Sequence, residues 1–138
     1  MKQKKSFIEF EKSLNEIDFI AQLIVNLTID INERFIFLKG EIGSGKTTLV
    51  QAIANFLKED KKVVSPSFNK MFVYDKFVHI DAYNMDGQNL EEFEDYFEDK
   101  LIIIEWPEKL SQKFDFGFQI EIIYVDDNKR KYIITWKE

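Results

Sequence analysis

The sequence contains no cysteine, only one histidine, and two arginines among its 138 residues. Without cysteine, disulfide bonds and thiolate metal sites are excluded, which fits a cytoplasmic protein. No apolar run approaches the roughly 20 residues that a membrane-spanning helix needs. The basic first residues are followed by alternating polar and apolar residues instead of a signal-peptide core. We therefore expect a cytoplasmic protein without membrane attachment.

Positive charge is also scarce, because the formal net charge of the chain is −6. Proteins bind nucleic acids mainly by neutralising phosphates with lysine and arginine. Short basic clusters occur at residues 2–5, 61–62 and 129–131, and each is typical of solvated surface. The composition therefore argues against direct binding of DNA or RNA by this chain alone.

Residues 40–47 read GEIGSGKT and match the phosphate-binding pattern G-x-x-x-x-G-K-[ST]. The glycines let backbone N–H groups point toward phosphate oxygens. Lys46 supplies a charge at the β- and γ-phosphates, and Thr47 supplies a hydroxyl ligand for Mg²⁺. The other loop residues expected to contact the nucleotide are Glu41, Gly43, Ser44 and Gly45. The loop predicts binding of a nucleoside triphosphate with Mg²⁺.

The chain is long enough for one domain, residues 1–138, and 45% of its residues are hydrophobic. Apolar periodicity predicts strands at 6–10, 35–38, 63–64, 71–74, 77–80 and 101–104, a C-terminal hairpin over 120–124 and 132–136, and helices over 13–27, 48–57 and 90–97. Ser13 and Glu16 form a capping box at the first helix. The expected fold class is α/β, a P-loop NTPase-like three-layer domain. Its mixed sheet has parallel strands around the phosphate loop and an added C-terminal antiparallel hairpin.

Two apolar runs end in an acidic residue, Asp81 after residues 77–80 and Glu105 after residues 101–104. Ligands of open α/β sheets bind outside the carboxyl ends of the strands, so both acids are expected at one crevice. A phosphate loop needs such acids to hold Mg²⁺ and to position water. We predict Lys46, Asp81 and Glu105 as catalytic residues and Thr47, Asp81 and Glu105 as metal ligands.

Two aromatic residues stand beside these acids. His79, two positions before Asp81, is typical of a partly buried and hydrogen-bonded strand histidine, although a role as base or switch stays open. Trp106 follows Glu105 directly, and its ring packs either beside the nucleotide base or over the strand end.

The motifs together resemble the TsaE (YjeE) family, small bacterial ATPases required for threonylcarbamoyladenosine synthesis in tRNA. The resemblance rests on GEIGSGKTT at 40–48, Ser-Pro-Ser-Phe at 65–68, His-Ile-Asp-Ala-Tyr at 79–83 and Ile-Glu-Trp-Pro-Glu at 104–108. The chain departs from the family pattern at Ser67, where threonine is usual, and at Asn84, where arginine is common. The loss of arginine at position 84 removes any role that depends on charge there.

The resemblance implies further roles in nucleotide binding. Thr48 contacts the α-phosphate, Ser65 begins a switch-like segment near the γ-phosphate, and Trp106 lies near the nucleotide. Ser13 and Asn15 border the adenine, and Arg130 or Lys129 fills the place of a family arginine after the hairpin turn. Asp81 supports hydrolysis and Glu105 acts at Mg²⁺.

The resemblance also implies partners. TsaE associates with the TsaD and TsaB proteins, which transfer the threonylcarbamoyl group to the adenosine next to the anticodon. ATP binding and hydrolysis by TsaE support repeated turnover of that transfer. Under this interpretation the chain meets tRNA only indirectly, through the complex, and is a monomer or weak dimer when alone.

The scarcity of arginine predicts a slow, partner-dependent ATPase, because phosphoryl transfer usually gains most from an arginine at the γ-phosphate. Neither Arg34 nor Arg130 stands in an obvious position for that role. Two alternatives remain at this stage. One is a small P-loop kinase acting on a metabolite, although such kinases usually carry an arginine-bearing lid. The other is a nucleotide-gated binding module that does not require hydrolysis.

Overall fold

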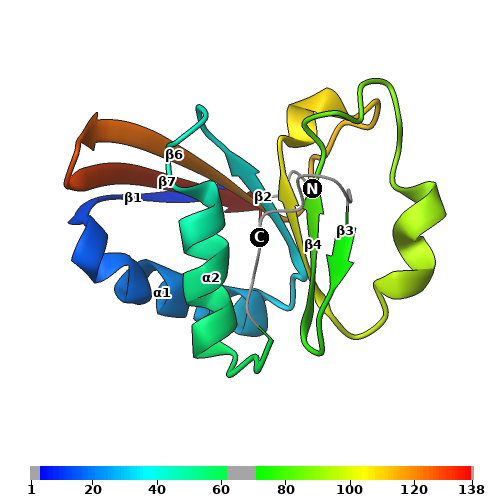
Figure 1. The fold of residues 1–138 in the computed structure, drawn as a ribbon, viewed down its shortest axis with the longest axis horizontal. Coiled ribbons are helices and arrows are strands. Elements are labelled where there is room, and N and C mark those ends of the chain that lie inside the picture. Colours follow the sequence, from blue (N-terminus) through cyan, green and yellow to red (C-terminus); the bar gives the residue numbers. More distant parts are fainter. Residues whose placement is uncertain (1–3, 62–70, 138) are drawn as a thin grey trace.

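The computed structural model describes residues 4–61 and 71–137 (Figure 1). The strands are β1 (Lys5–Ser13), β2 (Phe35–Lys39), β3 (Met71–Val73), β4 (Phe77–Asp81), β5 (Leu101–Glu105), β6 (Phe118–Asp126) and β7 (Lys129–Lys137). The helices are α1 (Ile17–Ile31) and α2 (Lys46–Phe56), together with the 3₁₀ helices η1 (Leu14–Glu16), η2 (Glu91–Tyr96) and η3 (Pro107–Lys109). The strand predicted at 63–64 and the Ser65–Phe68 motif lie outside the described residues.

The strands form one seven-stranded sheet in the order β1-β7-β6-β2-β5-β4-β3. β2, which leads into the phosphate loop, pairs in parallel with both β5 and β6, and β4 pairs in parallel with β5. The β6–β7 hairpin, β1 on β7, and β3 on β4 are antiparallel. The predicted mixed sheet and its C-terminal hairpin are therefore confirmed. This order places the carboxyl ends of β4 and β5 beside the loop that follows β2.

Both faces of the central strands are buried, as expected for parallel strands. Alternation along β2 directs Ile36 and Leu38 toward α1 and α2, which lie side by side on one face. Phe37 points to the opposite face and stacks on Phe114 with ring centroids 4.5 Å apart. The helix pair thus supports the end of β2 from one side, while irregular segments and 3₁₀ turns cover the other.

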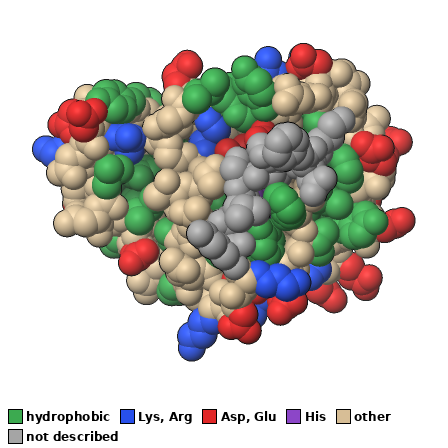
Figure 2. Space-filling model, in the orientation of Figure 1, with side chains coloured by type: hydrophobic (Ala, Val, Ile, Leu, Met, Phe, Trp, Pro, Cys, Tyr) green, Lys and Arg blue, Asp and Glu red, His purple; other side chains and the backbone are tan. Residues whose placement is uncertain are grey.

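The predicted acidic helix over 90–97 is instead the short 3₁₀ helix η2, and this prediction was wrong in helix type. Asn89 does accept a hydrogen bond from the N–H of Glu91 at 2.9 Å, as a capping residue would. Like charges three and four positions apart repel on an α-helix, and the segment has no basic residue to offset them. Its acidic side chains are exposed at the right-hand rim of Figure 2, whereas Leu90 and Phe97 are buried.

The first α-helix both starts and ends four residues later than predicted. The capping box of Ser13 and Glu16 is confirmed, but it opens η1, and α1 follows from Ile17 to Ile31. The helix ends where Asn32 adopts the left-handed conformation and its N–H reaches the carbonyls of Thr28 and Ile29. The helices in the part of the chain described here are all too short or too polar to cross a membrane.

Candidate nucleotide site

The phosphate loop is a tight bend between β2 and α2, and it depends on glycine at several positions. Gly43 and Gly45 have positive φ values of 81° and 109°, a region that side chains with a Cβ rarely adopt. A Cβ on Gly40 would lie 2.5 Å from Ser44 Oγ and 2.8 Å from the carbonyl oxygen of Ile122. The loop therefore folds closely onto itself and onto β6. Glu41 and Gly43 are exposed at its tip, whereas Ser44 is buried beneath it.

Lys46 begins α2, and its side chain folds back over the loop. Its Nζ donates hydrogen bonds to the carbonyl oxygens of Gly40 at 2.5 Å and Glu41 at 3.1 Å. The ammonium also lies 4.2 Å from the ring centroid of Trp106. Burial lowers the pKa of Lys46, and the negative charges of Glu105 and Asp81 oppose that shift. The carbonyl contacts hold a cation at the place where phosphate oxygens would compete for it.

Thr47 and two strand-end acids meet next to Lys46. Thr47 Oγ1 lies 3.4 Å from Glu105 Oε2, and Asp81 pairs in register with Glu105 across β4 and β5. A hydroxyl and carboxylates are hard oxygen ligands of the kind Mg²⁺ prefers, and Mg²⁺ sites at phosphates commonly use one or two carboxylates. Within residues 4–61 and 71–137, no group of three or more histidine, cysteine or acidic side chains could hold a metal alone. The donor set therefore fits Mg²⁺ only together with phosphate oxygens.

His79 completes this group, although the sequence argument did not include it among the site residues. Its side chain is fully buried, and its Nε2 lies 2.5 Å from Glu105 Oε2. The sequence predicted a partly buried, hydrogen-bonded histidine; the hydrogen bond is confirmed, and the burial is complete instead of partial. No signal in the sequence locates its partner, because the contact depends on the register of β4 and β5, which places His79 beside Ile103 and two positions before the Asp81–Glu105 pair.

Asp81 is half-buried and held by its own strand end. One of its carboxylate oxygens accepts a hydrogen bond from the N–H of Tyr83 at 3.0 Å. Burial raises the pKa of the Asp81 carboxyl, and the neighbouring Glu105 adds to the rise, while the Tyr83 N–H, His79 and Lys46 oppose it. Because burial disfavours the ionised form in the folded chain, an ionised Asp81 lowers the stability of the folded protein.

The Asp81→Asn variant is expected to unfold at a higher temperature than the wild type at pH 7 without nucleotide, by about 2–4 °C. The raised pKa means that the folded state binds more protons than the unfolded state, so stability is lost as pH rises through that window. Asparagine removes the ionised group and keeps an acceptor for the Tyr83 N–H. The gain should be full at neutral pH, shrink as the pH falls toward the ordinary aspartate pKa of about 3.9, and vanish only below it, where the carboxyl is protonated in both states.

Thermal unfolding between pH 4 and pH 8 measures this effect. Asp60→Asn, at an exposed position after α2, is the matched control and should show no such pH-dependent gain. A melting temperature that falls in Asp81→Asn at pH 7, or a gain that does not change with pH, would contradict the assignment.

Trp106 covers the site from the end of β5. It adopts the left-handed conformation with φ of 59°, and its N–H reaches the carbonyl of Leu38 at 3.2 Å. Its ring meets Tyr83 edge to face with centroids 5.0 Å apart. A non-glycine residue in this conformation is uncommon and is held by its surroundings. This backbone conformation and the contact with Tyr83 hold the Trp106 ring over the Lys46 ammonium.

Arg130 lies behind the loop, on β7. Its Nε donates to the carbonyl of Ser44 at 2.9 Å, and its Nη1 donates to the carbonyls of Asp126 and Lys129 at 2.7 and 2.9 Å. The guanidinium also stacks over Tyr124, 4.8 Å from the ring centroid. Arg130 thus ties the turn of the C-terminal hairpin to the phosphate loop.

The other residues proposed for nucleotide binding occupy the surroundings of this group. Ser13 and Asn15 are hydrogen-bonded to each other, and the N–H of Leu14 bonds to Asn128 of the hairpin turn, which places them at the same end of the sheet as Arg130. Thr48 is exposed in the first turn of α2. Ser65 lies outside the described residues. The structure therefore brings Lys46, Thr47, Asp81, Glu105 and Trp106 together, with Ser13, Asn15 and Arg130 at their edge.

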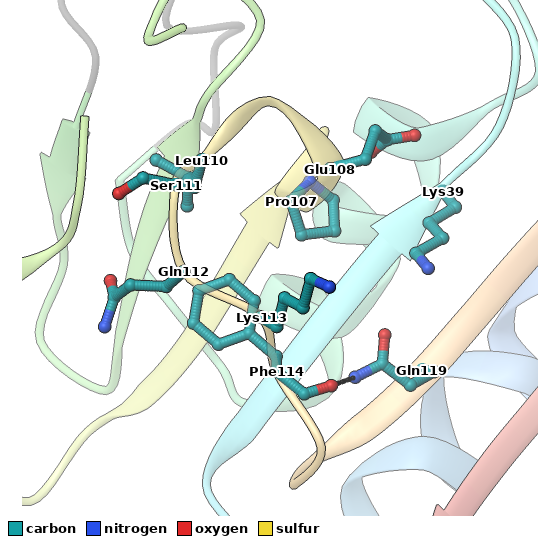
Figure 3. A pocket seen from close by; sticks show the side chains of 9 residues that line it. All are labelled: Lys39, Pro107, Glu108, Leu110, Ser111, Gln112, Lys113, Phe114 and Gln119. Atoms are coloured by element: carbon teal, nitrogen blue, oxygen red, sulfur yellow. Dashed lines mark hydrogen bonds between the residues drawn. The ribbon is translucent and has the colours of Figure 1, made fainter. Parts of the chain in front are cut away.

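Two hollows lie near the site. One, of about 440 Å³, reaches the phosphate loop and is lined by Gly40, Glu41, Trp106 and the end of β6. The other, of about 350 Å³, lies between β2, β6 and residues 107–114 (Figure 3). Lys39 borders both, and Gln119 spans the second by donating to the carbonyl of Phe114. Thr47, Asp81 and Glu105 line neither hollow.

Comparison with known proteins adds sequence and fold evidence. Residues 8–132 match the family model described as "Threonylcarbamoyl adenosine biosynthesis protein TsaE". The tRNA threonylcarbamoyladenosine biosynthesis protein TsaE of Aquifex aeolicus is 33% identical over 97% of each chain. The protein of that name from a Nostoc species is 32% identical over 72% of this chain and 68% of its own. The crystal structure of YdiB from Bacillus subtilis superposes with a TM-score of 0.65 at 22% identity, covering all of this chain and 89% of YdiB, and supports the fold alone.

Proposed function

The chain belongs to the TsaE family of tRNA threonylcarbamoyladenosine biosynthesis proteins, and we propose that it is a slow Mg²⁺-dependent ATPase of that pathway. Its ATP binding and hydrolysis support threonylcarbamoyl transfer by a TsaD–TsaB complex to the adenosine next to the anticodon. The observation that carries the proposal is the meeting of a phosphate loop with Thr47, Glu105 and Asp81 at one end of the sheet.

The roles of the residues follow from their contacts. Lys46 exchanges its two carbonyl acceptors for β- and γ-phosphate oxygens, which compete for the same ammonium. The N–H groups of the loop and the N-terminus of α2 bind the phosphates. Thr47 and Glu105 hold Mg²⁺, which when bound neutralises charge on the β- and γ-phosphates. Asp81 accepts a hydrogen bond from the attacking water, and Trp106 shields the phosphates from solvent.

The two arginines support partner dependence. Arg34 donates its Nη1 to the carbonyl of Phe97 at 2.8 Å, near the opposite end of β5. Arg130 is committed to the carbonyls of Ser44, Asp126 and Lys129. Both guanidiniums thus donate hydrogen bonds to backbone carbonyls of this chain. An arginine that contacts the γ-phosphate in the transition state raises the rate of hydrolysis by about 10³–10⁵ where it is present. The isolated chain should therefore hydrolyse ATP slowly.

Multiple-turnover ATPase assays with and without the TsaD and TsaB proteins test this proposal. We expect less than about one turnover per minute for the chain alone and an increase of at least about tenfold with both partners, because the missing electrostatic group comes from outside this chain. The same reactions with tRNA should show repeated threonylcarbamoyl transfer only with ATP. Fast hydrolysis by the isolated chain would refute the partner-completed mechanism, and the absence of nucleotide binding would refute the ATPase assignment itself.

A further inference from the structure

We propose that His79 is a positioning residue, which orients the Glu105 carboxylate toward Thr47 through a hydrogen bond from its Nε2–H. The inference rests on the proposed function, because it assigns Glu105 to the metal. It concerns a buried side chain that performs none of the steps described above. Its evidence is geometric: Glu105 Oε2 is shared between His79 Nε2 at 2.5 Å and Thr47 Oγ1 at 3.4 Å.

The direction of this hydrogen bond follows from the chemistry of its partners. An ionised carboxylate only accepts hydrogen bonds, so the nitrogen that faces Oε2 carries the proton. His79 Nδ1 is buried and has no hydrogen-bond partner within the described residues. The contact to Glu105 is thus the polar interaction that fixes the ring, and the same contact fixes the carboxylate.

Burial makes the contact consequential. His79 is fully buried and Glu105 is 4% exposed, so water cannot readily replace a lost partner at this oxygen. The two side chains come from adjacent parallel strands and are two residues apart in the register, and β4 and β5 hold their backbones in place. Removing the Nε2 donor would leave the Glu105 side chain free to change rotamer. Groups that hydrogen-bond to a metal ligand typically contribute 10- to 100-fold to metal affinity.

The wild-type protein gives the first test, since His79 is its only histidine and the imidazole signals are unambiguous. Nitrogen NMR of the side chain is expected to show a protonated Nε2 coupled to a slowly exchanging proton. Adding Mg²⁺ to the nucleotide complex should shift that resonance more than nucleotide alone. A ring protonated only at Nδ1 would overturn the proposal.

Two substitutions separate positioning from packing. His79→Gln places an amide donor near the Nε2 position, whereas His79→Asn places it near Nδ1, away from Glu105. The measurement is a Mg²⁺ titration of the binding of a fluorescent ATP analogue, and its midpoint is the Mg²⁺ concentration that gives half of the full Mg²⁺ effect. For His79→Asn we expect this Mg²⁺ midpoint to rise about 10- to 100-fold. His79→Gln should stay within about threefold of the wild type, and affinity without Mg²⁺ should change less than about twofold in both.

Ile103→Val is the control for packing, because Ile103 is buried on β5 opposite His79 in the register. It should lower the melting temperature without moving the Mg²⁺ midpoint. Equal midpoints for the glutamine and asparagine variants, or a comparable shift in Ile103→Val, would overturn the proposal. A wild-type protein that binds no nucleotide would instead refute the proposed function, and the NMR experiment on the free protein would still test the His79 contact.

Discussion

Replacing Lys46 by alanine is expected to reduce ATP hydrolysis by about a hundredfold or more, because the variant loses the ammonium that contacts the carbonyls of the loop. The same change should leave the nucleotide-free fold intact. Burial of this ammonium lowers its pKa and disfavours its charged form, and the negative charges of Glu105 and Asp81 only partly offset that cost. We therefore expect a melting temperature equal to or slightly above that of the wild type, together with loss of hydrolysis.

Lys100→Ala is a matched control for this experiment. Lys100 Nζ also donates to two backbone carbonyls, those of Tyr74 and Asp75, at 2.6 and 2.8 Å. It lies just before β5, at the end of that strand remote from Glu105. Both variants lose a lysine and two comparable hydrogen bonds, but only Lys46→Ala should lose hydrolysis. Activity retained in Lys46→Ala, or lost equally in both variants, would show that the loop lysine has no special role.

The position of the candidate site could be predicted from sequence because it depends on strand ends. Asp81 and Glu105 each close a continuous apolar run, and parallel strands bring their carboxyl ends to one edge. The loop that follows β2 lies at that edge because β2 pairs in parallel with β5. These relations follow from the positions of the apolar runs along the chain and from parallel pairing of the strands they form, so they could be predicted from the sequence.

The contacts of the site were not accessible in this way. Whether His79 reaches Glu105 or another group depends on the register between β4 and β5 and on a side-chain rotamer. The role of Arg130 at the carbonyl of Ser44 depends on how β6 and β7 pair around their irregularity at Tyr124 and Asp126. Sequence periodicity carries no information on either point, because it reports which face is apolar and not which atoms meet.

The acidic segment at 90–98 shows another limit of predicting structure from sequence. Leu90, Phe93 and Phe97 have spacings that an α-helix would place on one face, and the pattern therefore predicted such a helix. The spacing of apolar residues does not report the repulsion among the charged side chains of Glu91, Glu94 and Glu98. In the structure the 3₁₀ helix η2 forms in place of the predicted α-helix. Leu90 and Phe97 are nevertheless buried in the core and Phe93 is partly buried against it, so the apolar side of the segment faces inward although the helix type differs.

Glu105→Gln is expected to reduce the rate of hydrolysis by about 10²–10³ while ATP affinity falls less than about tenfold. In the proposed function Glu105 holds Mg²⁺, and a bound metal contributes several kcal/mol of charge stabilisation in the transition state. Each 1.36 kcal/mol is a tenfold change in rate. Glutamine keeps an oxygen that accepts from Thr47 Oγ1 and from His79, so the fold and the phosphate loop should be preserved. Glu108→Gln, an exposed acid three positions further on, is the control and should retain most activity.

The same variant separates the proposed ATPase from a nucleotide-gated module. Glu105→Gln should still bind ATP and the TsaD–TsaB pair, because its loop, Lys46 and Arg130 are unchanged. If hydrolysis resets the complex, one round of tRNA modification should proceed and later rounds should stop, since the nucleotide stays bound. Multiple rounds at the wild-type rate without hydrolysis would mean that ATP only selects a conformation, and the gate would then replace the ATPase as the function of this site.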